Sequence, residues 1–117
     1  MSRVRLVDIA HARSGDKGDT ANVGVIALQP EWYDLLAREL TLERVSAHFA
    51  GMIDGPVQRY ELPNLRALNF LLHGALDGGG TLSLKTDAQG KVYSTALLRM
   101  VLDVPDDEVR RLGLPTR

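Results

Sequence analysis

Apolar residues along the chain alternate with polar ones in some stretches and repeat at helical spacing in others. The aliphatic run at residues 4–11 predicts a first strand, and the run at residues 22–28 predicts a second. Apolar residues of the second run fall on both of its faces. This is typical of a central strand that is covered on two sides, or on one side by a partner subunit. Residues 13–20 are polar and contain glycine, and this composition predicts a loop between the two strands.

Two helices and a strand are predicted next. Residues 30–40 should form an amphipathic helix, because their apolar residues recur at helical spacing. Thr41 can cap a second helix at its N-terminus, and Gly51 is suited to end that helix. The proline and the charged residues of the segment 56–62 predict a short strand at the edge of a sheet.

The remaining elements are predicted from one leucine stripe and one pair of alternating runs. Pro63 should open another helix, in which leucines form an apolar stripe over residues 65–76. Alternation over residues 81–86 and 92–102 predicts a hairpin. Residues 104–117 carry two prolines and mixed charges, which predicts a loose helix or arm.

The order of these elements predicts the fold class. Two strands, two helices, a strand, a helix and two strands are typical of an α+β fold with helices packed on one face of a mostly antiparallel sheet. A length of 117 residues fits one domain. We place that domain at residues 1–103 and treat residues 104–117 as a C-terminal tail.

Composition excludes several classes of protein. Without cysteine, the chain has no disulfide, no thiolate nucleophile and no cysteine-bound zinc or iron–sulfur cluster. Fourteen basic residues against fifteen acidic ones leave no electrostatic footprint for nucleic acid. No apolar run approaches the length that spans a membrane, and no secretion signal opens the chain. We therefore expect a cytoplasmic protein without nucleic-acid or membrane partners.

The densest polar segment, residues 11–22, is the strongest chemical candidate. Its arginine and lysine can meet a carboxylate or phosphate, its histidine can transfer a proton, and its glycines let backbone N–H groups converge on an anion. The spacings of phosphate loops, calcium loops and nucleophile elbows are not met. A long turn whose side chains bond their own backbone is the structural alternative. Candidate catalytic residues are His11, Asp16 and Lys17, and candidate ligand-binding residues are Arg13, Ser14, Lys17, Asp19 and Asn22.

Other polar residues have structural interpretations. His48 lies where a helix should end and can cap it, and His73 should be solvated beside the leucine stripe. Asn69 is expected on the buried side of the leucine helix, where its amide can hold a neighbouring strand or loop. Tyr60 should pack on the edge strand. The scattered histidines do not have the spacing of a metal site, so we expect neither a metal nor a cofactor.

Four motifs occur in a fixed order. They are the polar segment at 11–22, Ala-His-Phe-Ala-Gly at 47–51, Tyr-Glu-Leu-Pro-Asn-Leu at 60–65 with Ala-Leu-Asn-Phe at 67–70, and the glycine-rich run at 74–80. Together the motifs resemble the small ferredoxin-like domain of the acyclic terpene utilisation (AtuA-like) family. The similarity covers residues 5–103, which is nearly the whole chain.

The resemblance implies a ferredoxin-like fold and a partner. In that family the small domain typically follows a much larger domain or is encoded as a separate small protein. The family is associated with the breakdown of citronellol- and geraniol-type terpenes at the level of acyl-CoA intermediates. The resemblance draws attention to His11, Arg13, Ser14, Asp16, Lys17, Asp19 and Asn22, and secondarily to His48, Tyr60, Asn64 and Asn69.

Three functions are compatible with these observations. The first is an accessory domain that assembles with itself, as a homo-oligomer, or with a separate large AtuA-like chain in acyl-CoA and terpenoid catabolism. The second is a catalytic or ligand-binding half-site in which the segment 11–22 binds a carboxylate or CoA-type anion. The third, an RNA-binding module, is the weakest, because only Tyr93 offers an aromatic ring on the last two expected strands.

Overall fold

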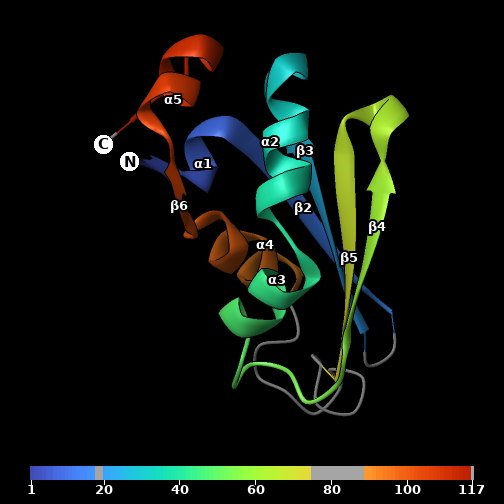
Figure 1. Ribbon diagram of the computed structural model, residues 1–117. Helices are drawn as coiled ribbons and strands as arrows, with labels where there is room; N and C mark the ends of the chain where they lie inside the picture. Colours follow the sequence, from blue (N-terminus) through green and yellow to red (C-terminus); the bar gives the residue numbers. More distant parts are fainter. Residues whose placement is uncertain (18–19, 75–88, 117) are drawn as a thin grey trace.

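The computed structural model describes residues 1–17, 20–74 and 89–116, with the backbone alone at 16–17 and 89–92. The elements in chain order are β1 (Ser2–Arg5), α1 (Leu6–Ile9), β2 (Ala10–Lys17), β3 (Thr20–Ala27), a 3-10 turn (Pro30–Trp32), α2 (Tyr33–Glu39), α3 (Leu42–His48), β4 (Val57–Leu62), a second 3-10 turn (Pro63–Leu65), β5 (Ala67–His73), α4 (Gln89–Leu98), β6 (Val101–Val104) and α5 (Asp106–Leu112). The order β2-β3-β5-β4 forms an antiparallel sheet, with α2, α3 and α4 on one face (Figure 1). The predicted α+β fold is confirmed.

The strand pairing departs from a simple ferredoxin-like arrangement at one edge. Strand β3, helices α2 and α3, strands β4 and β5, helix α4 and strand β6 supply the βαββαβ order of such folds. Strand β6, however, pairs with β1 in a separate antiparallel ribbon. The N-terminal strand β2 takes the edge position next to β3. The polar segment therefore belongs to the main sheet.

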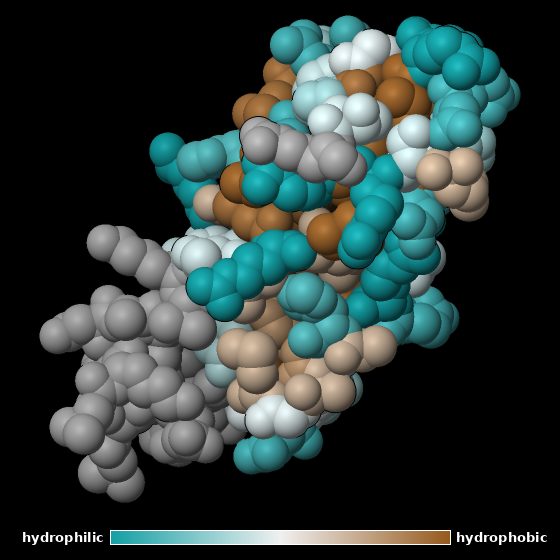
Figure 2. Space-filling view, turned by 90° about the vertical axis from the view of Figure 1, so that its left-hand side faces the viewer, coloured by the Kyte–Doolittle hydropathy of each residue, from teal (hydrophilic) through white to brown (hydrophobic). Residues whose placement is uncertain are grey.

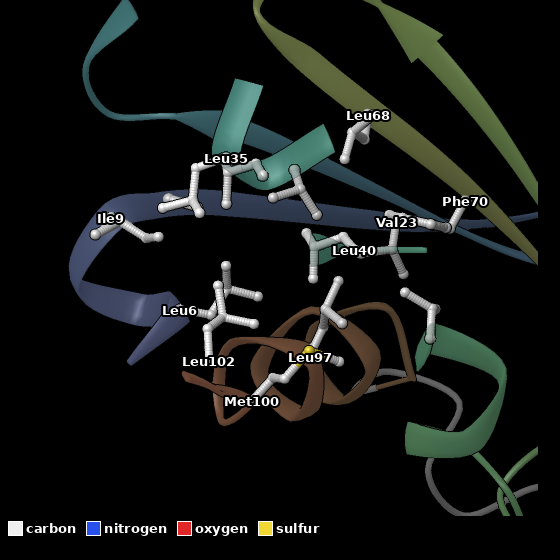
Figure 3. Close-up of a cluster of buried hydrophobic side chains, with 14 of the residues drawn as sticks. Leu6, Ile9, Val23, Leu35, Leu40, Leu68, Phe70, Leu97, Met100 and Leu102 are labelled. Atoms are coloured by element: carbon white, nitrogen blue, oxygen red, sulfur yellow. The ribbon is translucent and has the colours of Figure 1, made fainter. Parts of the chain in front are cut away.

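The core lies between the main sheet and the helices (Figure 3). Alternate residues of β3 and β5, including Val23 and Phe70, point toward the helices and are fully buried. Leu40 and Leu97 meet them from the helix layer, while Leu102 of β6 closes the same cluster. Because the sheet has one buried face, its register determines which side chains reach the opposite face.

The polar segment predicted as a loop is instead a strand. Residues 10–17 pair with β3 along their whole length, from Ala10 opposite Ala27 to Lys17 opposite Thr20. A polar, charged sequence is compatible with an edge strand, because one side of that strand faces solvent. Residues 10–17 and 20–27 thus form an antiparallel strand pair, and the loop predicted over 13–20 is wrong for the described residues 13–17 and 20. The first predicted strand, 4–11, is also interrupted, since α1 separates β1 from β2.

The helix predicted after Pro63 is wrong as well. Pro63–Leu65 makes one 3-10 turn, and Ala67–His73 is the strand β5 between β3 and β4. Leu68, Phe70 and Leu72 are two residues apart, as in a strand, whereas the leucines of residues 65–76 also recur at helical spacing. The segment therefore fits both the strand period and the helix period. Pairing on both edges decides in favour of the strand.

The predicted hairpin at the C-terminal end is corrected in its second half. Residues 89–98 form α4, and only Val101–Val104 of the predicted strand 92–102 is extended. Tyr93, Leu97 and Met100 are buried and recur at helical spacing. The β-branched residues of the segment favour a strand instead, which is why the sequence predicts one there. The first predicted strand, 81–86, lies outside the described residues, as does the glycine run 78–80.

Several local predictions are confirmed. The helix predicted at 30–40 is present as a 3-10 turn followed by α2, and the strand predicted at 56–62 is the edge strand β4. The Thr41 hydroxyl accepts a hydrogen bond from the Arg44 backbone N–H at 3.1 Å, so this residue caps α3 as expected. Strand β3 lies inside the sheet.

The C-terminal tail forms the helix α5, which is tied to the rest of the fold. The indole N–H of Trp32 donates to the Leu112 carbonyl at 2.8 Å, and Leu114 is buried. Arg38 of α2 binds both carboxylate oxygens of Glu108. That pairing lowers the pKa of Glu108 and raises the pKa of Arg38.

Replacing Trp32 by phenylalanine should loosen α5. The change removes the indole donor, leaves the Leu112 carbonyl without its partner and reduces the buried ring, so we expect a loss of about 1–2 kcal/mol in the free energy of unfolding. Urea unfolding measures the loss, and limited proteolysis shows whether the tail is cut first. Equal stability and equal protease resistance would contradict this role of Trp32.

Candidate functional site

The face of the main sheet that the helices leave open carries the candidate site. Strand pairing places Arg13, Gly24, Asn69 and Tyr60 in one row across β2, β3, β5 and β4. A neighbouring row contains Gly15, Asn22, Leu71 and Gln58, and the row on the other side contains His11, Ile26, Ala67 and Leu62. The open face thus combines one guanidinium, several amides, an imidazole and a group of apolar side chains.

Glycines make a hollow in this face. The hollow has a volume of about 460 Å³. Its lining residues are Arg13, Ser14, Gly15, Asn22, Gly24, Ile26, Leu62, Leu65, Ala67, Leu68 and Asn69. At Gly24 an added Cβ would have Asn69 Oδ1 as its nearest neighbour, at 3.8 Å, so the position has room for a Cβ in ordinary van der Waals contact. A volume of this size fits a small molecule, since binding pockets fall in roughly the range 300–1,000 Å³.

The polar side chains in the hollow are available to a ligand. Arg13 and Asn22 are exposed, and Asn69 is half-buried. Among the described residues, none supplies these three side chains with a hydrogen bond or an ion pair. Arg5, in contrast, donates to both oxygens of Asp8 at 3.0 and 3.2 Å. Arg13 is therefore the better placed of the two to receive an anion.

The charge of the open face is positive. From His11 to Gly15 on β2, Thr20 to Ile26 on β3, Ala67 to His73 on β5 and Gln58 to Leu62 on β4, no position on this face holds aspartate or glutamate. Glu61 points the other way and is bound by Arg59 at 2.8 Å. An anion beside Arg13 would meet no repelling carboxylate from these strand positions.

A 3-10 turn builds the apolar rim of the hollow. Leu62 ends β4, Pro63–Leu65 turns, and Arg66 adopts a left-handed backbone with φ of 51° before β5 begins. The turn is held by the Arg66 carbonyl, which accepts from the Ala27 N–H at 3.0 Å. Leu65 is left largely exposed beside Leu62. Asn64, in the same turn, is exposed.

The predicted site residues separate into three groups. His11, Arg13 and Asn22 share the open face. Ser14 points to the opposite face of the sheet, which the helices cover, because side chains alternate along a strand. Its hydroxyl is buried there without a hydrogen-bond partner among the described residues. For Asp16 and Lys17 the backbone alone is described, and Asp19 lies outside the described residues. A ligand that meets the Arg13 side chain therefore does not meet the Ser14 hydroxyl.

The remaining histidines take part in hydrogen bonds. His73 Nδ1 lies 3.2 Å from Thr20 Oγ1, and its Nε2 lies 2.7 Å from Gln58 Oε1, which joins β3, β5 and β4 beyond the hollow. His48 Nε2 lies 2.6 Å from the Ala96 carbonyl oxygen, so it fastens α3 to α4. The sequence predicts a structural role for His48 as a cap at the end of its own helix. The contact is structural, but it is made with α4.

Helix-side polar groups near the site are structural. Tyr33 is almost fully buried on α2, and its hydroxyl has no partner among the described residues. Burial raises the pKa of this tyrosine, with Glu61 adding to the shift. Because Tyr33 lies on the covered side of the sheet, it does not reach the hollow.

A second hollow lies on another side of the molecule. It has a volume of about 330 Å³ and is lined by Arg5, Val7, Thr95, Leu98 and Arg99. On the side that carries α1, β6 and the chain ends, apolar surface is broken up by hydrophilic side chains (Figure 2). This hollow lacks the convergent, unpaired amides of the open face, so it is the weaker candidate.

The described residues offer neither a metal cluster nor a membrane-spanning helix. Over residues 1–17, 20–74 and 89–116, no three or more acidic or histidine side chains cluster as metal ligands do. In that same part of the chain, no helix combines the length and the apolar character needed to cross a membrane.

Sequence reasoning missed much of the open face. The sequence pattern draws no attention to Gly24 or Leu65 as site residues, and it wrongly predicts a helix around Asn69. No short-range pattern joins these residues, because β3 and β5 are more than 40 positions apart in the chain. The correct signal was alternation in 67–73, once that segment is taken as a strand.

Comparison with known proteins agrees with the fold. A family model described as the AtuA ferredoxin-like domain matches residues 4–103. No curated protein and no solved structure matches the chain. The matched range runs from β1 into β6 and includes the whole open face. The chain therefore belongs to the AtuA ferredoxin-like domain family.

Proposed function

We propose that this chain is an accessory subunit in acyl-CoA and terpenoid catabolism, and that its open sheet face is a half-site covered by a larger AtuA-like chain. One observation carries the proposal: the helices that the structure describes leave uncovered a sheet face that contains a hollow. Ile26, Tyr60 and Leu62 are exposed on this face, and Leu65 adjoins it.

Charge favours a different chain over a second copy as the covering partner. Pairing two identical open faces would place two arginine-bearing surfaces together, and no aspartate or glutamate of these strand positions would lie between them. A larger subunit with no positive charge opposite Arg13 avoids this repulsion. The chain's membership of the AtuA ferredoxin-like domain family supports the pathway only through the resemblance described in the sequence analysis, which implies terpene breakdown through acyl-CoA intermediates.

Substitution of Tyr60 by aspartate should weaken assembly with the larger chain. Tyr60 lies on the open face but outside the hollow, on the exposed edge strand β4. We expect the wild-type chain and the large AtuA-like protein of the same organism to form one complex in analytical ultracentrifugation. Tyr60→Asp should raise the dissociation constant by at least about thirtyfold, as for an interface residue that dominates binding.

Val101→Asp is the matched control. Val101 is 38 % exposed on β6, against 46 % for Tyr60, and it lies on the separate two-stranded ribbon. Equal weakening by both variants, or no complex at all, would contradict the proposed face. A dimer of this chain alone that Tyr60→Asp separates would replace the larger subunit with a second copy.

A further inference from the structure

We infer that the hollow on the open face binds the carboxylate group of an aliphatic acid. Arg13, Asn22 and Asn69 would hold the carboxylate beside Gly24, and the apolar rim would hold the hydrocarbon chain. This inference rests on the proposed function, because it names the ligand of the half-site that the larger chain covers.

The polar part of the hollow suits a single carboxylate. Arg13 and Asn69 flank Gly24 from the two neighbouring strands, which places their backbones about 10 Å apart. The glycine between them has no side chain, so a small anion can sit against the backbone of β3. Guanidinium groups bind carboxylates through two parallel hydrogen bonds, and amide N–H groups can donate to the same oxygens.

The apolar part of the hollow suits a hydrocarbon chain. Ile26, Leu62 and Leu65 lie at the end of the hollow nearest the β4–β5 turn, next to the buried Ala67. The polar and apolar groups therefore occupy different ends of one hollow: Asn22 lies in the row beyond Gly24, and Ile26 lies in the row before it. A ligand with a charged head and an apolar tail can satisfy both ends together.

A phosphate is a poorer fit than a carboxylate. Arg13 is the sole arginine or lysine among the described side chains that line the hollow, and a doubly charged phosphate usually gathers several cationic or backbone donors. The apolar lining would contribute nothing to a free phosphate. We therefore assign the site to a monocarboxylate with an aliphatic chain.

Titration with three probes tests the assignment. Octanoate, 1-octanol and inorganic phosphate are added to the isotope-labelled chain, alone and in complex with the larger protein, and backbone amide shifts are followed by NMR. Octanoate should bind about 10–100 times more tightly than octanol, with the largest shifts at Asn22, Gly24 and Asn69. Phosphate should cause no saturable shift at these residues.

One variant removes the contact with the carboxylate, and a second fills the hollow itself. Arg13→Gln should remove the preference for octanoate over octanol, and Arg99→Gln is the control that removes an equal charge outside the hollow. Gly24→Val should abolish binding of both octyl compounds by filling the hollow. A Cβ has room at Gly24 and valine favours strands, so the fold should be retained, as its melting temperature will show.

The outcomes are decisive and distinct from those of the assembly test. Equal affinity for octanoate and octanol, unchanged binding in Gly24→Val, or saturable binding of phosphate alone would overturn the inference. Arg13→Gln should still assemble with the larger chain, whereas Tyr60→Asp alone should still bind octanoate. If the wild-type chain formed no complex with the larger chain but kept its octanoate preference, the proposed function would be overturned and the carboxylate site would stand.

Discussion

Replacing Gly74 by alanine should lower the melting temperature by roughly 15–25 °C, which corresponds to about 4 kcal/mol at this chain length. Gly74 has φ of +69°, a conformation that costs any residue with a Cβ. An added Cβ would also lie 2.7 Å from the Gly55 backbone nitrogen, closer than packed atoms approach. Both effects act on the same residue, and neither can be relieved by moving a flexible side chain.

The crossing of two backbone segments explains the tightness at Gly74. The Gly55 N–H donates to the His73 carbonyl at 2.9 Å, and the Asp54 N–H donates to the Gly74 carbonyl at 3.1 Å. These bonds extend the pairing of β4 with β5 beyond Val57. Gly55→Ala should be destabilising for the same reason, because its Cβ would lie 2.8 Å from the His73 carbonyl oxygen.

Gly15→Ala provides the matched control for these substitutions. No atom of the described part of the chain lies within 4 Å of a Cβ at Gly15, and its φ is not in the left-handed region. Thermal unfolding followed by circular dichroism should place this variant within about 0.5 kcal/mol of wild type. A small effect at Gly74, equal to that at Gly15, would contradict the close crossing.

Replacing Arg59 by methionine should cost about 3 kcal/mol in the free energy of unfolding. Arg59 reaches from β4 to the C-terminal end of α2, where Nε donates to the Leu40 carbonyl at 2.9 Å and Nη2 donates to the Ala37 carbonyl at 2.6 Å. Helix C-termini leave carbonyls without partners, and a buried carbonyl that loses its donor costs about 1–3 kcal/mol. Methionine keeps the apolar stem but supplies no donor.

Two further variants show whether the guanidinium itself is required. Arg59→Lys should recover less than half of the loss, because an ammonium cannot reproduce the planar pair of donors that meets both carbonyls. Arg38→Met is the control: Arg38 is half-exposed and pairs with Glu108 at the surface, where such pairs contribute about 1 kcal/mol or less. Urea unfolding should rank the losses in that order, and an equal loss at Arg38 and Arg59 would refute the capping role.

Local signals predicted part of the fold well. The helix behind Pro30, the Thr41 cap and the edge strand at 56–62 depend on neighbouring residues, and all three are present. Strand β5 and helix α4 depend on distant partners instead. Leucines in 65–76 satisfy a helical period and a strand period at once, so only pairing with β3 and β4 could decide between them.

The candidate site was predictable in its chemistry but not in its geometry. Arg13 and Asn22 were singled out because polar types gather there, and both lie on the open face. Ser14 was grouped with them because a loop imposes no alternation. Once the segment is a strand, neighbouring residues point to opposite faces, and Ser14 is separated from Arg13 by the sheet itself.

The pairing of β1 with β6 has a consequence for handling the protein. That pairing places the N-terminal amine 3.5 Å from a carboxylate oxygen of Asp106, so the beginning of the chain lies beside α5 (Figure 1). Figure 1 shows the beginning of the chain and the end of its described part near each other, on the side of the two-stranded ribbon and away from β4 and β5. A surface tether or a fused carrier attached at either end would therefore present the domain in nearly the same orientation, with the hollow still accessible to a partner.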